Sequence, residues 1–174
     1  MSLWRTVALV ASSLLSLSCS VNPPSGVRPV EKFDVNRYLG TWYEIARLDH
    51  RFETGLDHVT AQYSLRDDGG LDVINKGYSP ATQRFRQSNG KAYFLASPQR
   101  ASLKVSFFGP FYGGYHVIAL DEGYDYALVC GPNRDYLWIL ARAKTLPQAT
   151  RDHLVATAAR LGFAVDRLIW VDQS

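Results

Sequence analysis

From residue 41 onward, short runs that alternate apolar and polar residues are separated by residues that favour turns. This pattern is typical of an antiparallel sheet built from hairpins. Eight such runs predict eight strands, over residues 41–48, 58–66, 71–78, 90–96, 102–108, 115–120, 126–130 and 136–142. Between the second and third runs stands Asp67-Asp68-Gly69-Gly70, a strong hairpin turn because glycine adopts a positive φ without strain. The sequence therefore predicts an all-β domain.

The period of the pattern changes near the C-terminus. Thr145-Leu146-Pro147-Gln148 fits a capping box with proline in the first turn, and Leu154, Ala158 and Leu161 recur at helical spacing. Gly162 follows as a C-cap. One helix of about four turns is therefore expected, and residues 168–171 alternate again, which predicts a short ninth strand.

Eight sequential strands can form a sandwich or an up-and-down barrel. Tight hairpins favour the barrel, whose closure also removes the sheet edges. An eight-stranded barrel has an interior that side chains fill or that holds one small ligand. Because the chain reverses at each hairpin, loops 48–57, 79–89, 109–114 and 131–135 share one end of the barrel, here called the mouth. The turns at Asp67, Pro98 and Asp121 share the other end, the base.

The first nineteen residues predict export and lipidation. Arg5 precedes an apolar run, Thr6 to Leu17, whose length is that of a signal-peptide core rather than of a spanning helix. Ser16-Leu17-Ser18-Cys19 resembles the lipobox of bacterial lipoproteins, which implies a diacylated Cys19 as the new N-terminus. Ser16 stands where leucine is usual, so cleavage by an ordinary signal peptidase, leaving an unanchored periplasmic protein, is the alternative.

The segment that follows predicts a spacer. Ser20 follows the cysteine directly. In Gram-negative lipoproteins an aspartate at this position resembles an inner-membrane retention signal, so the serine implies transfer to the outer membrane. Residues 20–32 are rich in proline and lack periodicity, which predicts an extended tether of roughly 40 Å at ~3.1 Å per residue. The expected organisation is a signal peptide over 1–18, the lipidated cysteine and tether over 19–32, and one domain over 33–174.

Three motifs carry a resemblance to a known family. The stretch from Asp34 to Arg47, Asp-Val-Asn-Arg-Tyr-Leu-Gly-Thr-Trp-Tyr-Glu-Ile-Ala-Arg, resembles the first signature of the lipocalins, built on Gly40 and Trp42. A reduced second motif is Leu120-Asp121-Glu122, and Arg142 matches the arginine that closes the eighth strand. With the lipobox, Asn75-Lys76-Gly77-Tyr78 and Phe107-Phe108-Gly109-Pro110-Phe111, the chain is similar to the bacterial outer-membrane branch of that family over nearly its whole length.

Strand parity places Trp42, Asp121 and Arg142 at the base. An arginine over a buried indole gains roughly 0.5 to 2 kcal/mol of cation-π attraction and can donate to otherwise unpaired carbonyls. We therefore interpret Gly40, Trp42, Asp121 and Arg142 as the structural base of the barrel rather than as ligand contacts.

The resemblance implies binding of fatty acids and phospholipids, lysophospholipids especially. Alternation predicts that mostly apolar and partly small side chains point inward, which favours a cavity over a filled core. The predicted lipid-binding residues are Ala46, Ala61, Tyr63, Val73, Asn75, Leu103, Val105, Phe107, Tyr115, Val117, Val129, Trp138 and Leu140. A phosphate or carboxylate head group could meet Arg51 in the mouth segment Asp49-His50-Arg51, although a solvated charge run is an equal alternative.

Composition and charge exclude several other classes. The formal net charge of +3 is spread along the 174 residues without a basic stripe, so no nucleic-acid partner is expected. Cys19 and Cys130 are the two cysteines, and no zinc-site spacing is present, so neither a metal nor another cofactor is expected. The apolar mouth segment Phe108-Gly109-Pro110-Phe111-Tyr112 predicts a membrane or partner contact, and the family resemblance allows a homodimer.

Two other functions remain as hypotheses. One is a carrier of a compact ligand such as haem or a retinoid. The other is a lipid-modifying enzyme, which the sequence disfavours because His50, His58, His116 and His153 lack a nearby nucleophile with an acidic partner. The only inward polar groups that parity predicts are Tyr63, Asn75 and Tyr115, and none is a good base at neutral pH. We therefore expect a binding protein and not an enzyme.

Overall fold

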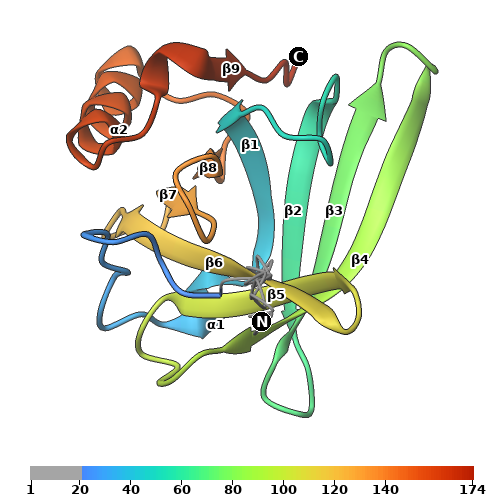
Figure 1. The fold of residues 1–174 in the computed structure, drawn as a ribbon. Coiled ribbons are helices and arrows are strands. Elements are labelled where there is room, and N and C mark those ends of the chain that lie inside the picture. The colour runs from blue at the N-terminus through green and yellow to red at the C-terminus, as the bar shows by residue number, and fades with distance from the viewer. Residues whose placement is uncertain (1–20) are drawn as a thin grey trace, which may run out of the picture.

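The computed structural model describes residues 21–174, and its nine strands and single long helix are drawn in Figure 1. The strands are β1 (Gly40–Leu48), β2 (Asp57–Leu65), β3 (Leu71–Ser79), β4 (Arg84–Phe94), β5 (Ser102–Phe108), β6 (Phe111–Leu120), β7 (Tyr126–Cys130), β8 (Leu137–Ala141) and β9 (Leu168–Trp170). The helical elements are α1 (Val35–Tyr38), α2 (Gln148–Arg160) and the 3-10 turn η1 (Val165–Arg167).

The strands form a closed antiparallel barrel, which confirms the predicted fold class. Each of β2 to β8 pairs with its neighbour in the chain, and β1 closes the ring between β8 and β2. The ninth strand also forms, and pairs with β1 at Ala46, Arg47 and Leu48. The barrel is therefore up-and-down, as the tight hairpins indicate, and not a sandwich.

The first strand changes partner halfway along its length. Its first part, Gly40 to Tyr43, pairs with β2, and its last part pairs with β9. A bulge between Glu44 and Ala46 shifts its register against β8. Near the bulge, the side-chain amide of Gln173 donates to the carbonyls of Glu44 and Val59, at 2.8 Å each. The C-terminal segment thereby joins β1 and β2 where their ladder stops.

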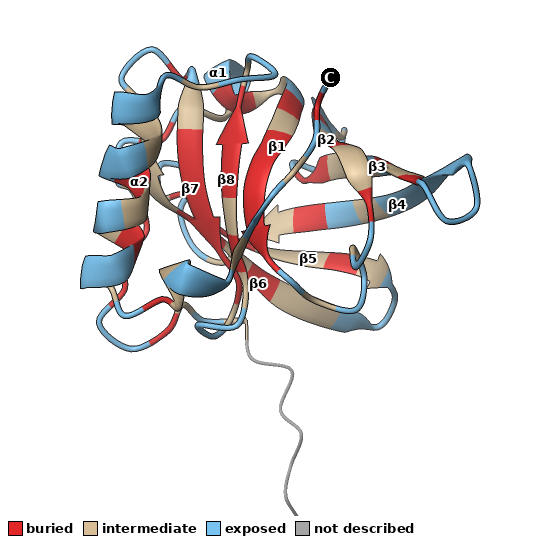
Figure 2. Ribbon diagram, turned by 90° about the horizontal axis from the view of Figure 1, so that it is seen from above, coloured by how far each residue is buried: buried red, intermediate tan, exposed pale blue. Residues whose placement is uncertain are grey.

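Two hydrophobic cores lie on opposite faces of the barrel wall. One fills the barrel interior near the base and includes Trp42, Val117 and Val129. The other lies between the outer face of the wall and α2, which packs through Leu154 and Ala158 and exposes its other side (Figure 2). The predicted capping box is wrong, because Pro147 is the N-cap and no side chain caps the helix. Gly162 has a φ of +82°, as a C-cap requires.

The mouth differs from the prediction at the β3–β4 connection. We expected a loop over 79–89 and a strand from 90, whereas β4 begins at Arg84 and pairs with β3 from Ser79 to Leu71. Residues 84–89 are all exposed. Because both faces of this hairpin arm meet water, its sequence has no apolar alternation from which a strand could be predicted.

The segment before the barrel is corrected as well. Val27 is buried, and the backbone of Val30 exchanges hydrogen bonds with Val117 and Ala101 at 2.9 Å. The predicted free tether is therefore wrong for this stretch, which packs along β6 as part of the folded domain. The signal peptide and Cys19 lie outside the described residues.

Candidate ligand cavity

A cavity of about 100 Å³ lies inside the barrel, between the interior core and the mouth. Its walls are mainly apolar side chains from β2 to β5, together with Trp138 and Leu140 of β8. Ligand pockets commonly measure about 300–1,000 Å³. An acyl chain would therefore have to displace side chains as it enters.

Ten of the thirteen predicted contacts line this cavity: Ala61, Tyr63, Val73, Asn75, Leu103, Val105, Phe107, Tyr115, Trp138 and Leu140. Val117 and Val129 point into the barrel but belong to the packed core beneath the cavity. Ala46 is wrong, because it packs with the core under α2. The bulge after Glu44 reverses the side-chain alternation. Parity counted from Trp42 therefore holds as far as Glu44 and fails at Ala46.

Three tyrosine hydroxyls form the polar floor of the cavity. Tyr115 is hydrogen-bonded to Tyr38 at 2.7 Å and to Tyr63 at 2.8 Å. Burial raises the pKa of all three phenols, so each stays neutral at physiological pH. Higher in the wall, Asn75 Oδ1 is buried without a hydrogen-bond partner among residues 21–174, which leaves an acceptor free for a polar ligand atom.

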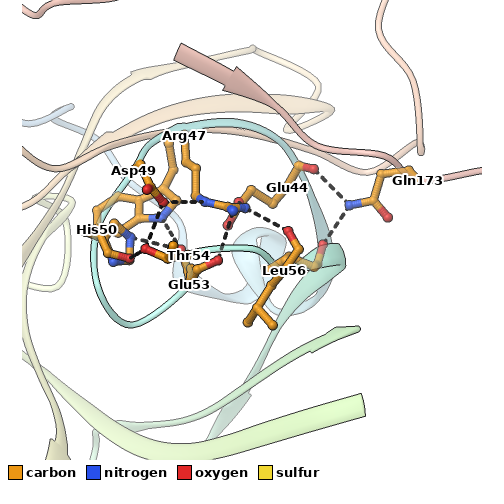
Figure 3. Close-up of polar contacts among 10 residues, drawn as sticks. Glu44, Arg47, Asp49, His50, Glu53, Thr54, Leu56 and Gln173 are labelled. Carbon is orange, nitrogen blue, oxygen red and sulfur yellow. Dashed lines mark hydrogen bonds and ion pairs between the residues drawn. The ribbon is translucent and has the colours of Figure 1, made fainter. Parts of the chain in front are cut away.

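At the mouth end, four charged or titratable side chains form what we call the mouth cluster: Glu44, Arg47, His50 and Glu53 (Figure 3). Arg47 Nη1 lies 2.8 Å from Glu44 Oε1, and its guanidinium also donates to the carbonyls of Glu53 and Leu56. His50 Nε2 lies 2.9 Å from Glu53 Oε2. The cluster therefore fixes the β1–β2 loop to β1, the strand that precedes it.

A hydrogen bond also joins this loop to β8, the strand that pairs with β1. Trp138 Nε1 donates to Glu53 Oε2 at 3.0 Å. The indole of Trp138 further packs on His50, with ring centroids 5.3 Å apart. Since Glu44, Glu53 and Trp138 all line the cavity, a ligand's polar end would meet this cluster at the mouth.

The two carboxyl groups of the mouth cluster have opposite pKa shifts. Burial, strengthened by the negative charge of Glu53, raises the pKa of Glu44 well above its ordinary value, and Arg47 offsets this only in part. Burial also acts to raise the pKa of Glu53. Hydrogen bonds from His50 and Trp138, with the charges of His50 and Arg47, outweigh that effect and lower it. Glu53 is therefore the carboxyl group that carries negative charge most readily.

Sequence reasoning missed this cluster. It left only tyrosine and asparagine as inward polar groups, whereas Glu44 and Glu53 also face the cavity. One signal was available, because Glu44 and Arg47 are three residues apart in an otherwise apolar run. Residues at that spacing face opposite sides of a regular strand, so their ion pair requires the bulge. Nothing local predicts Glu53, which reaches the cavity from a loop.

Other predicted mouth residues lie elsewhere. Arg51 is exposed and its guanidinium lies 4.8 Å from the Phe52 ring centroid, so it does not line the cavity. His116 is fully buried on β6, within 3.0 Å of Ser102 Oγ, and burial lowers its pKa to about 4. His116 therefore does not line the cavity. Cys130 is also buried, and burial raises its thiol pKa to about 12.

The base holds the motif residues in contact. The Arg142 guanidinium lies 4.0 Å from the Trp42 ring centroid and donates to the carbonyls of Thr41, Arg37 and Leu39, at 2.8 Å each. Gly40 has a φ of +90° and faces Arg142. Asp121 Oδ2 accepts from the backbone of Gly123 in the adjacent turn. None of these residues lines the cavity.

Arg142→Ala is therefore expected to lower the free energy of unfolding by roughly 1 to 3 kcal/mol, because three carbonyls lose their donor. Chemical denaturation measures the loss, and binding of an acyl-chain ligand below the transition should persist. Unchanged stability with abolished ligand binding would instead place Arg142 in the ligand site.

Neither a metal site nor a membrane helix is found over residues 21–174. No group of three or more metal-ligating side chains is gathered there, and none of the helices in this part of the chain has the length and apolar character to cross a bilayer.

The family model described as "Lipocalin-like domain" matches residues 33–173. The chain belongs to the lipocalin family. Proteins named "Outer membrane lipoprotein Blc" are similar throughout: that of Escherichia coli K12 is 60% identical, covering 99% of this chain and 98% of its own. The Vibrio cholerae protein is 48% identical, covering 97% and 99%.

One more distant relative and one solved structure are also similar to this chain. Mouse "Apolipoprotein D" is 32% identical over 83% of this chain and 79% of its own. Insecticyanin from the tobacco hornworm Manduca sexta superposes with a TM-score of 0.70 at 23% identity, covering 88% of both chains. At that identity the likeness concerns the fold alone.

Proposed function

We propose that this lipocalin binds and stores or transports lipids with an acyl chain, such as fatty acids, lysophospholipids and phospholipids. The observation that carries the proposal is the apolar cavity, closed below by neutral tyrosines and bounded at the mouth by charged side chains. An amphiphile fits this change from apolar interior to charged mouth, with its acyl chain inside the barrel and its head group at the mouth. No observation favours a compact ligand such as haem or a retinoid.

The physical driving force is burial of methylene groups. At ~0.8 kcal/mol per methylene, a sixteen-carbon chain yields on the order of 12 kcal/mol before association and ordering costs. Part of that energy is spent on opening the narrow cavity. Arg47 is largely satisfied by Glu44 and two carbonyls, so a head group would interact with the mouth cluster as a whole rather than with a free cation.

The proposal includes an anchor at Cys19 and attachment to the outer membrane, facing the periplasm. The lipobox-like sequence before Cys19 supports this, as do the printed names of the similar enterobacterial and Vibrio proteins. A homodimer stays a prediction, as does cleavage after residue 18.

Tryptophan fluorescence provides the test of binding. Trp138 lines the cavity and bonds to Glu53, so titration with lysophosphatidylcholine or palmitate should change its emission. Trp138→Phe should remove most of the response, whereas Trp170→Phe, on the outer strand β9, should preserve it. A full response in Trp138→Phe would show that the ligand binds elsewhere.

We expect binding without turnover. His50 and Glu53 form a close pair at the mouth, yet no serine or cysteine side chain lines the cavity of the described domain. Incubation with lysophospholipids at high protein concentration should release no fatty acid above the level given by Glu53→Gln or His50→Ala. Sustained release that either substitution abolishes would make the protein an enzyme.

A further inference from the structure

The mouth carries a rim of exposed phenylalanines. Phe52 lies on the β1–β2 loop, Phe85 on the β3–β4 arm, and Phe108 and Phe111 flank the β5–β6 turn, each with more than half of its surface exposed. In Figure 1 the β3–β4 and β5–β6 hairpins both project beyond the barrel on the right. We define these four residues as the aromatic rim. They are all the largely exposed phenylalanines of the described chain.

Cationic side chains accompany the aromatic rim. Arg51 lies over Phe52, Lys76 Nζ lies 4.6 Å from the Phe85 centroid, and Lys104 Nζ lies 4.9 Å from the Tyr112 centroid. Exposed Arg84 and Arg86 flank Phe85 on the same arm. The acidic residues of the mouth loops are Asp49, Glu53 and Asp57 around the β1–β2 loop and Asp135 on the β7–β8 loop, and Glu53 is already engaged by His50 and Trp138. Aromatic rings with adjacent cations suit an anionic lipid surface.

The N-terminal segment leads to the same end of the barrel. Val30 pairs with Val117 halfway along β6, and the Val21 carbonyl lies against Gly114, close to the β5–β6 turn. The chain therefore runs toward the mouth as it is traced back toward its start. The described chain thus begins at Val21 beside β6, two residues after Cys19 in the sequence.

We propose that the aromatic rim is a membrane-docking surface, which seats the mouth of the barrel on the anionic leaflet that holds the Cys19 anchor. This proposal rests on the anchored form of the proposed function. The anchor and the rim then contact one bilayer together, and lipid passes between leaflet and cavity without crossing open water. The base, with Arg142 and the Asp67 turn, faces away from the membrane.

The test uses the full, acylated chain in vesicles of phosphatidylethanolamine and phosphatidylglycerol. An environment-sensitive dye is attached at Phe108→Cys, with Leu65→Cys as the matched control, since Leu65 is also exposed but lies beside the base turn. Buried Cys130 does not compete for the dye. We expect a blue shift and quenching by spin-labelled lipids at position 108, neither of them at position 65, and a smaller shift in pure phosphatidylcholine vesicles.

Several results would overturn docking. One is water-like emission of the dye at both positions. Another is a dye at position 108 that is protected from water but not quenched by spin-labelled lipid, together with dimers in sedimentation. That result would assign the aromatic rim to contact with a second copy of the chain. Phe111→Cys replaces Phe108→Cys if the latter fails to fold. Mass spectrometry that finds Cys19 unacylated would overturn docking together with the anchor. Acylation and intact Trp138 quenching without protection at position 108 would overturn docking alone.

Discussion

Replacing Arg47 with methionine is expected to lower the free energy of unfolding by about 3 to 5 kcal/mol, the usual cost of removing one partner from a buried ion pair. Arg47 is 1% exposed and satisfies Glu44 as well as the carbonyls of Glu53 and Leu56. Without it, two carboxyl groups face each other across the cavity mouth with no cation between strand and loop. Urea denaturation at neutral pH measures the loss.

Arg51→Met is the matched control, because Arg51 is an exposed arginine of the same loop, and it should change stability by less than about 0.5 kcal/mol. Glu44→Gln added to Arg47→Met should recover part of the loss by removing the uncompensated charge. Equal stability of the two methionine variants would show that the mouth cluster is not a structural element.

The loss should also depend on pH. Burial raises the pKa of Glu44, so Glu44 binds a proton more readily in the folded than in the unfolded chain. A group with a raised folded pKa stabilises at low pH and loses that contribution as pH rises through the folded value. Arg47→Met raises this pKa further, so its deficit should be larger in mildly alkaline than in acidic buffer. Glu44→Gln in the same background should flatten the profile.

The second large effect concerns the cavity. Ala61 lines it from β2, where its neighbours across the sheet are Trp42 and Asn75. Ala61→Trp would fill the narrow space with an indole and should weaken binding of lysophosphatidylcholine by about a hundredfold or more, since several methylenes lose their place. Overpacking should cost about 1 to 3 kcal/mol of stability, which leaves the barrel folded.

Gln62→Trp is the control for this substitution, since Gln62 is the next residue of the strand and is exposed on the outer face. It should bind lipid as the native chain does. Calorimetric titration or dialysis with a labelled lipid suits the comparison, because the introduced tryptophans disturb fluorescence. Similar affinities for both variants would contradict a site within the barrel.

The sequence predicts the barrel because most strands are regular and bury one face. Tyr63, Val73 and Leu103 follow simple alternation, and the structure places all three in the cavity wall. Alternation fails where the backbone departs from regularity, as at Ala46 beyond the bulge. It is also silent where no face is buried, as in residues 84–89.

Contacts made by loops and chain ends were beyond local patterns. Glu53 reaches the cavity through contacts with Arg47 and Trp138, and the latter is 85 residues away in the sequence. Val27 becomes buried only because the segment before the barrel packs along its wall. The placement of such residues depends on tertiary contacts with the folded barrel. Without those contacts, the composition of a proline-rich segment predicts only a spacer.

The central claim is that an acyl lipid occupies the interior of this lipocalin. Organic extraction of the purified native chain, Ala61→Trp and Gln62→Trp, followed by mass spectrometry of the released lipids, tests it most directly. The account predicts stoichiometric acyl lipid from the native chain and Gln62→Trp, and little from Ala61→Trp. Equal lipid from all three chains, or none from the native one, would contradict it.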